Sequence, residues 1–223
     1  MTEEKNLDQE IEFIIENYRP DQYDDVIAEK EEWEFYYHLS SLRRSLFCWY
    51  PFDPAWQVLE VGAGFGALTG CIAEQCAGVT ALESDSFRAA ACAKRYEGDE
   101  RVHTLQTDIF SLPDDQLYDC VVTVDQIEHF PGRGKPFLDA CAAHLKPGGL
   151  LLIGFRNRFG MKYLCGAEDE FQAVPFENLP PGKPKLLMKC GYVPFPPSLR
   201  FAGNPKKTVV ISSFLREELW PSY

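Results

Sequence analysis

The residues best suited to chemistry follow an apolar run, Val58 to Val61, in a stretch that reads Gly62-Ala63-Gly64-Phe65-Gly66. Glycines at these spacings permit a tight turn and let the backbone approach a ligand closely. The free N–H groups of the helix that we expect next would face that ligand. Glu60, at the end of the apolar run, points a carboxylate toward the same crevice. A carboxylate repels pyrophosphate and attracts a cationic group such as the ammonium of an amino acid.

The glycine pattern alone does not identify the ligand. They also fit the dinucleotide-binding fingerprint, with Gly62, Gly64 and Ala67 in its three places. A nicotinamide-dependent dehydrogenase is therefore one alternative, which Glu60 disfavours because of its charge. A strand, turn and helix that bind nothing is another, which the polar residues further along the chain disfavour.

Polar residues end each of the strands expected after the glycines. Glu83, with Ser84 beside it, lies about twenty residues past Gly62, the spacing at which an acid accepts both ribose hydroxyls. Asp108 can accept from an adenine amino group while its neighbour Ile109 covers the ring. Asp125 ends the fourth expected strand. Since ligands of open parallel sheets bind at the carboxyl ends of strands, we expect these side chains to converge.

Strand-like and helix-like runs alternate along the chain, which predicts a doubly wound α/β fold. The pattern predicts strands at 58–61, 79–82, 102–105, 119–124 and 150–155, and helices at 86–95 and 134–145. Two last strand candidates, 192–195 and 208–214, predict an antiparallel C-terminal hairpin. Together they predict a Rossmann-like, seven-stranded and mostly parallel sheet.

Residues 1–50 predict an acidic N-terminal helical cap. Apolar residues recur at helical spacing over 6–18 and again from about 25 to 49, with Pro20 between the two helices. Residues 1–34 hold thirteen Asp and Glu against three Lys and Arg, so they account for most of the net charge of -12. We interpret this acidity as a solvated helix face. The chain has no basic face of the kind that duplex nucleic acid requires.

The remaining composition indicates an ordinary globular protein. Eight cysteines are scattered without a C-x-x-C pair, which favours buried reduced thiols over a disulfide scaffold or a metal site. Neither a basic-then-apolar signal peptide nor an apolar run long enough to span a bilayer occurs in the sequence. We therefore expect a cytoplasmic protein with no membrane span and no bound metal.

With Glu60 and Gly66, the glycine stretch resembles the first motif of class I S-adenosylmethionine-dependent methyltransferases, Glu/Asp-x-Gly-x-Gly-x-Gly. Asp108-Ile109, the run 118–122 and the run 145–149 resemble the later motifs of that family, in the same order. The resemblance implies a methyltransferase domain within residues 51–223 that binds S-adenosylmethionine and releases S-adenosylhomocysteine. The cofactor-binding residues that it implies are Glu60, Gly62, Ala63, Gly64, Gly66, Glu83, Ser84, Asp108, Ile109 and Asp125.

A narrower resemblance covers the runs 37–40, 49–52 and 157–163. These are similar to a bacterial methyltransferase group associated with glycosyltransferases of envelope polysaccharide synthesis. The resemblance implies a small-molecule or glycan-related acceptor and association with a glycosyltransferase. Residues 166–170 read Gly-Ala-Glu-Asp-Glu, where that group tends to place a histidine last. This departure keeps open a second hypothesis, a catalytically silent methyltransferase-like module that binds the cofactor or a partner.

The acceptor side offers its own candidates. Methyl transfer needs a general base only when the acceptor must lose a proton, and His129 is the candidate for that role. The alternative for His129 is a histidine bonded to backbone at a helix start. Four residues after the fifth strand are candidates for acceptor binding: Arg156, Asn157, Arg158 and Lys162. Arginine suits phosphate or carboxylate, so we expect an anionic acceptor under an insertion at about 157–184, unless these are ordinary surface cations. A metal-assisted alternative through Asp125 and Asn157 ranks low.

Overall fold

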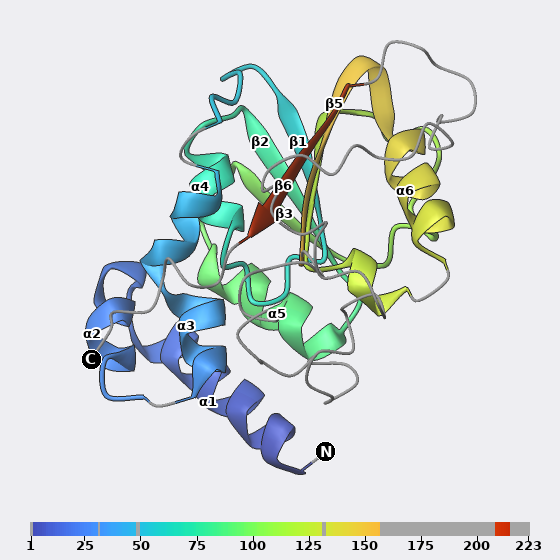
Figure 1. Ribbon diagram of the computed structural model, residues 1–223. Coiled ribbons are helices and arrows are strands. Elements are labelled where there is room, and N and C mark those ends of the chain that lie inside the picture. Colours follow the sequence, from blue (N-terminus) through green and yellow to red (C-terminus); the bar gives the residue numbers. More distant parts are fainter. Residues whose placement is uncertain (1, 31, 48–49, 131–132, 157–207, 215–223) are drawn as a thin grey trace, which may run out of the picture.

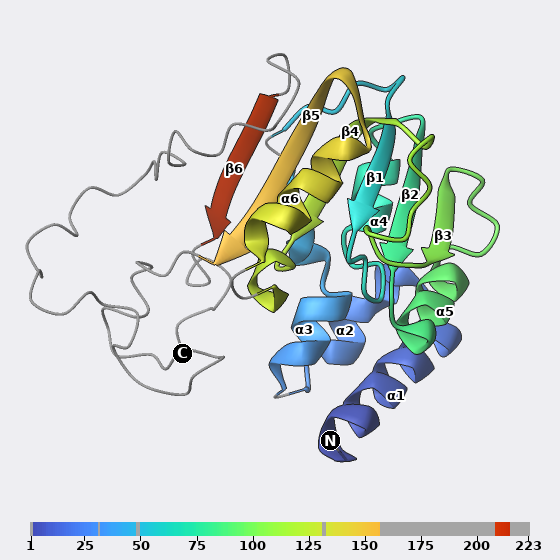
Figure 2. The same cartoon turned by 90° about the vertical axis from the view of Figure 1, so that its right-hand side faces the viewer.

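A parallel sheet forms the centre of the molecule. The structure is a computed structural model that describes residues 2–30, 32–47, 50–130, 133–156 and 208–214. All six strands in these ranges run parallel, in the order β3-β2-β1-β4-β5-β6 (Figure 2). The strands are β1 (Gln57–Val61), β2 (Gly78–Glu83), β3 (Val102–Gln106), β4 (Tyr118–Val124), β5 (Leu145–Arg156) and β6 (Thr208–Phe214). This order is that of a doubly wound fold, as the sequence predicts.

The strand order reverses direction between β1 and β4. From β1 the chain builds outward through β2 to β3, and it then returns to place β4 on the other side of β1. In the middle strand, Glu60 lies opposite Ala81 of β2 and Val122 of β4. The loops after β1 and β4 therefore diverge, and ligands of open sheets bind in the crevice that this leaves at the carboxyl ends.

Helices cover both faces of the sheet, which is why its strands are apolar on both sides. One face packs against α4 (Thr69–Ala73) and α5 (Ser86–Arg95), and Val58 of β1 points to it. The opposite face packs against α6 (Gly134–Ala143), and the next residue, Leu59, points there. In Figure 2, α6 lies in front of the sheet and α4 behind it.

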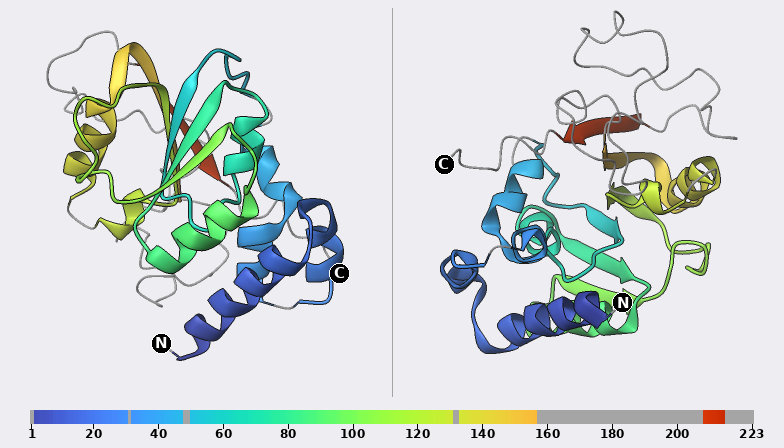
Figure 3. Two further views of the ribbon diagram at one scale, coloured as in Figure 1. Left: turned by 180° about the vertical axis from the view of Figure 1, so that it is seen from behind. Right: turned by 60° about the horizontal axis from the view of Figure 1, so that its bottom comes forward.

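The N-terminal helices lie beyond the carboxyl ends of the strands, next to the arrowheads in Figure 2. They are α1 (Thr2–Asn17), η1 (Pro20–Gln22), α2 (Tyr23–Ile27), α3 (Trp33–Leu39) and η2 (Ser41–Leu46). α1 lies along α5 (Figures 1 and 3). Ile11 and Phe35 share a buried cluster with Phe65, from the glycine stretch, and Ala91, from α5. None of the helices in the described ranges has the length and apolar character needed to cross a membrane.

The single helix expected from about 25 to 49 is wrong, because α2, α3 and η2 take its place. The backbone of Ser40 is extended, with φ -63° and ψ 136°, and its hydroxyl accepts a hydrogen bond from the N–H of Leu42 at 3.2 Å. Asp24 accepts a second hydrogen bond from the N–H of Ser41 at 3.1 Å. Such side chains offer the backbone partners outside a helix, so the helix ends where they act.

The strand expected at 208–214 is present as β6, but it pairs with β5 in parallel, from Leu150↔Thr208 to Arg156↔Phe214, so the expected antiparallel hairpin is not found in the described residues. A parallel neighbour needs a crossover of about a dozen residues or more, and residues 157–207 are long enough to supply one. The expected strand at 192–195 and the insertion at 157–184 lie outside the described residues. The described sheet therefore has six parallel strands, and the seven-stranded sheet with a hairpin is not confirmed.

Candidate functional site

The glycine turn after β1 is held against the end of β2. The N–H groups of Gly62 and Ala63 both donate to the carbonyl of Leu82 at 2.9 Å. Gly62 has φ +78° and Gly64 has φ +56°, a region that residues with a Cβ rarely adopt. The turn therefore depends on glycine at these positions, as the sequence predicts.

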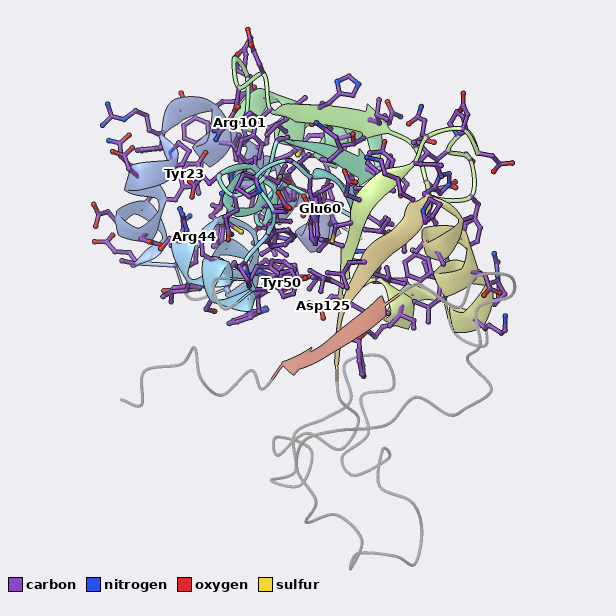
Figure 4. All side chains as sticks on the ribbon, turned by 90° about the horizontal axis from the view of Figure 1, so that it is seen from above. Tyr23, Arg44, Tyr50, Glu60, Arg101 and Asp125 are labelled. Atoms are coloured by element: carbon purple, nitrogen blue, oxygen red, sulfur yellow. The ribbon has the colours of Figure 1, made fainter. Side chains whose placement is uncertain are left out.

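Glu60, in β1, lies in the interior of the molecule (Figure 4). The residue is 4% exposed, and the hydroxyl of Thr69 donates to its Oε2 at 2.6 Å. Burial raises the pKa of Glu60 to about 7, and the hydrogen bond from Thr69 opposes that rise. The carboxyl group is thus poised to ionise when a cationic group arrives beside it.

Glu83, at the end of β2, faces the same turn. Its Oε2 accepts from the N–H of Gly64 at 2.8 Å, and its Oε1 accepts from the N–H of Asp85 at 2.9 Å. Carboxylate oxygens have several lone pairs, so both oxygens can accept further hydrogen bonds. The side chain is therefore fixed in place beside the glycines with capacity left for hydroxyl donors.

Asp125 follows β4 on the other side of the crevice. It has φ +55°, an uncommon conformation that marks functional sites in many proteins. The hydroxyl of Tyr37, in α3, donates to Oδ2 of Asp125 at 2.9 Å. Burial is the main cause that raises the pKa of Tyr37, which keeps this donor protonated. The contact joins the N-terminal helices to the end of β4.

A pocket of about 180 Å³ joins these groups. Of the residues predicted to bind the cofactor, six line it: Glu60, Gly62, Ala63, Gly64, Glu83 and Asp125. His129, the predicted base, lines the same pocket although its side chain is exposed. The structure thus brings together the ends of β1, β2 and β4, as the strand-end rule predicts.

Four of the predicted cofactor residues do not line this pocket. Ser84 and Asp108 are exposed, and Oδ1 of Asp108 accepts from the N–H groups of Phe110 at 2.8 Å and Ser111 at 2.9 Å. Ile109 is 3% exposed and packs in the core under α6. Gly66, the fourth, is buried. Asp108 and Ile109 lie at the end of β3, beyond Glu83, so they could meet only a ligand that extends past the pocket.

The N-terminal helices add three lining residues that the sequence analysis did not assign: Tyr37, His38 and Arg43. Arg43 is 8% exposed, its guanidinium lies 3.9 Å from the ring centre of Tyr37, and its Nε has no hydrogen-bond partner. Burial lowers the pKa of His38 to about 3, and three nearby arginines add to this. A buried arginine that lines the same pocket as Glu60 and Asp125 is therefore the feature that was hardest to predict from the sequence. The one signal in the sequence was that Arg43 and Arg44 interrupt the apolar residues of the stretch 39–47.

Gln126, next to Asp125, closes the pocket over the glycine turn. A Cβ on Gly62 would lie 2.1 Å from Cδ of Gln126, so the side chain of Gln126 packs directly against the backbone of Gly62. The amide side chain occupies the space directly above the turn. Any ligand that approaches the backbone of Gly62 must displace it.

The predicted acceptor residues lie at the limit of the structure. The backbone of Arg156 ends β5, while Asn157, Arg158 and Lys162 lie outside the described residues. Asp125 and Asn157 cannot be compared as metal ligands for the same reason. In the described ranges, no three residues among His, Cys, Asp and Glu converge as a metal site would require.

Comparison with known proteins agrees with this geometry. Residues 58–149, from β1 into β5, match the family described as "Methyltransferase domain". The ubiquinone biosynthesis O-methyltransferase of Rickettsia typhi (strain ATCC VR-144 / Wilmington) is 34% identical over 111 residues, 49% of this chain and 45% of that protein. The corresponding protein of Rickettsia prowazekii (strain Madrid E) is 32% identical over 111 residues, 49% of this chain and 44% of its own length. The chain thus spans less than half the length of these curated relatives.

Among solved structures, the DhpI–SAH complex has a TM-score of 0.46 at 22% identity, covering 59% of this chain and 62% of that one. The N-methyltransferase NodS from Bradyrhizobium japonicum WM9, in complex with S-adenosyl-l-homocysteine, has a TM-score of 0.42 at 22% identity, covering 63% and 68%. The family match covers residues 58–149, which include the glycine turn, Glu83 and Asp125.

Proposed function

We propose that the protein binds S-adenosylmethionine in the pocket at the ends of β1, β2 and β4 and transfers its methyl group to a small-molecule acceptor. The observation that carries this proposal is a pocket lined by two buried ionisable side chains, Glu60 and Arg43, together with the half-buried Asp125. An amino acid end carries an ammonium and a carboxylate. The unpartnered Nε of Arg43 offers a charge-assisted hydrogen bond to the carboxylate, and Glu60 and Asp125 suit the ammonium.

The rest of the cofactor is assigned along the strand ends. Glu83 accepts from the ribose hydroxyls, using the lone pairs that Gly64 and Asp85 leave free. Asp108 accepts from the adenine amino group, beside Ser84 and the backbone at Ile109. These residues lie in the order β1, β2, β3 across the sheet, so an extended ligand can meet them one after another.

The pocket as it stands is smaller than the roughly 300–1,000 Å³ of typical small-molecule sites. Gln126 fills the space over Gly62, and Tyr37 closes the side toward β4. We therefore infer that Gln126 turns away when the cofactor binds. Its side chain is long and half-buried, so this movement needs no change in the backbone.

S-adenosylmethionine, when bound, would supply a methyl group on a sulfonium, and S-adenosylhomocysteine would leave as a thioether when an acceptor atom takes the methyl group in line. The chain's part is to orient both molecules and to exclude water. Tyr37, Arg43 and Gln126 form the walls of the pocket toward the N-terminal helices and β4. His129, at the rim of the pocket, accepts the proton of an acceptor hydroxyl. The names of the two relatives, O-methyltransferases, support a hydroxyl oxygen as the methylated atom.

For the acceptor we propose an anionic small molecule or glycan-related compound, and association with a glycosyltransferase. The proposal rests on the similarity of residues 157–163 to the bacterial group described above and on the cations Arg156, Arg158 and Lys162. Guanidinium groups bind phosphate and carboxylate through paired hydrogen bonds. The backbone of Arg156 ends β5, the strand beside β4.

Substitution of Glu83 tests the cofactor assignment. Glu83→Gln keeps an oxygen for the N–H of Gly64 but removes the charge, and we expect a loss of about 1.5–3 kcal/mol in cofactor binding, the usual value of a charged hydrogen bond. Calorimetric titration with S-adenosylhomocysteine measures this directly. Glu100→Gln, an exposed acid before β3, is the control. Equal affinity of the Glu83 variant and the wild type would refute the ribose role.

A transfer assay separates the enzyme from the silent module. Radiolabelled S-adenosylmethionine is offered with neutral and anionic hydroxyl acceptors, including phenols and sugar phosphates. We expect turnover of an anionic acceptor that falls in Arg158→Ala and in His129→Ala. Tight cofactor binding without turnover of any acceptor would favour the silent module, and turnover of neutral acceptors alone would overturn the anionic acceptor.

A further inference from the structure

The hydroxyl of Tyr96 bridges two backbone groups, one in the glycine stretch at Gly66 and one in the first turn of α4 at Gly70. Tyr96 directly follows α5, and its hydroxyl donates to the carbonyl of Gly66 at 2.5 Å and accepts from the N–H of Gly70 at 3.0 Å. Burial raises its pKa to about 12, so the hydroxyl remains a donor at neutral pH. Both backbone partners belong to the stretch that shapes the proposed cofactor pocket.

These two partners are four residues apart, the separation of an ordinary helical hydrogen bond. In an uninterrupted helix the N–H of Gly70 would donate directly to the carbonyl of Gly66. Here the hydroxyl stands between them and satisfies both, and α4 begins only at Thr69. A side chain inserted in this way opens the helical ladder locally. The hydroxyl of Tyr96 therefore takes the place of a direct hydrogen bond between Gly70 and Gly66 at the start of α4.

The glycines at both partners fit this insertion. A Cβ on Gly66 would lie 2.7 Å from the ring of Tyr96, and a Cβ on Gly70 would lie 2.8 Å from it. Gly66 also has φ +77°, whereas Gly70 has an ordinary helical backbone. Glycine at position 70 thus has no conformational reason, and the tyrosine ring is the reason that the structure provides.

The position at which α4 begins bears on the pocket. Thr69 is the first residue of α4, and from there its hydroxyl reaches Oε2 of Glu60 at 2.6 Å. The neighbour of Tyr96, Arg95, donates to the carbonyl of Phe65 at 3.1 Å and to that of His38 at 2.8 Å. The end of α5 therefore fixes the glycine stretch from behind, on the side away from the ligand, and ties it to α3.

We propose that Tyr96 is a positioning residue for cofactor binding, whose hydroxyl sets where α4 begins and thereby places the glycine turn and Glu60. The proposal rests on the proposed function, since it assigns Tyr96 to the same cofactor pocket. Tyr96 itself does not line that pocket. Its effect on a ligand passes through Gly66, Gly70 and Thr69.

Tyr96→Phe in the full-length chain tests the proposal, because the ring still separates the two backbone groups and only the hydroxyl is lost. The first readout needs no ligand: amide hydrogen exchange followed by NMR. The N–H of Gly70 should exchange at least tenfold faster in the variant, since it loses its acceptor. Tyr118→Phe is the matched control, a buried tyrosine under α6 whose hydroxyl donates to Gln116 at 3.2 Å. It should leave the exchange of Gly70 unchanged.

The second readout is the dissociation constant for S-adenosylhomocysteine, measured by calorimetry beside the free energy of unfolding. We expect Tyr96→Phe to weaken binding about tenfold, while Tyr118→Phe loses a similar free energy of unfolding and keeps wild-type affinity. Unchanged exchange at Gly70, or equal affinity in both variants, would overturn the role of Tyr96. If the wild type itself does not bind the ligand, the proposed function fails, and the claim that Tyr96 sets the start of α4 is decided by the exchange of Gly70 alone.

Discussion

The buried carboxyl group of Glu60 makes the stability of this protein depend on pH in a definite direction. Burial raises its pKa in the folded protein to about 7, from an ordinary value of 4.5 that the unfolded chain regains. Between these two values the folded protein holds a proton that the unfolded chain has lost. The contribution of Glu60 to the free energy of unfolding is therefore fully present below pH 4.5. As the pH rises from 4.5 to about 7 this contribution is lost, and the free energy of unfolding falls by about 3 kcal/mol in total.

We expect Glu60→Gln to remove this dependence. Urea unfolding of the wild type and the variant at pH 5 and pH 8 measures it, and the comparison cancels the titration of all other groups. The stability of the wild type relative to the variant should fall by roughly 2–3 kcal/mol between the two pH values, because a small part of the effect is already lost at pH 5. Glu100→Gln, at an exposed acid, should show no such change. A constant difference between wild type and Glu60→Gln would mean that Glu60 ionises normally in the fold.

Residues that end a strand were predictable, and residues that reach the pocket from elsewhere were not. Glu60, Glu83 and Asp125 could be placed from the sequence because each directly follows or ends an apolar run, and parallel strands end at one edge. Arg43 comes from η2, before the first strand, and Tyr96 acts from behind the glycine stretch. Both roles depend on packing between elements, which no local spacing of residues encodes.

At the scale of elements, the regular strands and α5 followed from the sequence, while connections between distant segments did not. Apolar runs located β1 to β4, and Asp85 caps α5 where the pattern predicts its start, accepting from the N–H of Phe87 at 2.9 Å. The break between α3 and η2 depends on Asp24 and Ser40, two polar side chains that accept hydrogen bonds from the backbone of Ser41 and Leu42. The parallel pairing of β6 is a long-range contact, which turn residues alone could not reveal.

The attachment of α1 to α5 is expected to depend on apolar contact more than on charge. Ile11 is fully buried beside Phe65 and Ala91, and its replacement by alanine should cost about 2–5 kcal/mol. Asp8 pairs with Arg88 at 3.0 Å, but both side chains remain partly exposed, so Asp8→Asn should cost about 1 kcal/mol or less. Urea unfolding of the two variants decides the order. A larger loss for Asp8→Asn would show that the ion pair, and not the buried cluster, holds the helix.

For the whole molecule, we expect the N-terminal helices and the sheet to fold as one unit. Their shared cluster joins Ile11 and Phe35 to Phe65 in the glycine stretch. Arg95, at the end of α5, also donates a hydrogen bond to the carbonyl of His38 in α3. Removal of residues 1–50 would expose that cluster and remove Tyr37 and Arg43 from the pocket. Residues 51–223 alone should therefore aggregate or unfold without a cooperative transition, as judged by circular dichroism and gel filtration. A soluble, cooperatively folded fragment with full cofactor affinity would contradict this expectation.

The claim at the centre of this account is that the pocket recognises S-adenosylmethionine and not a dinucleotide. Calorimetric titration of the full-length chain with S-adenosylmethionine, S-adenosylhomocysteine and NAD measures it most directly. The buried Glu60 and Arg43, with Glu83 and Asp125 beside them, predict saturable binding of the first two ligands at one site, and no binding of NAD, whose pyrophosphate would face Glu60. Binding of NAD in place of S-adenosylmethionine would contradict the account.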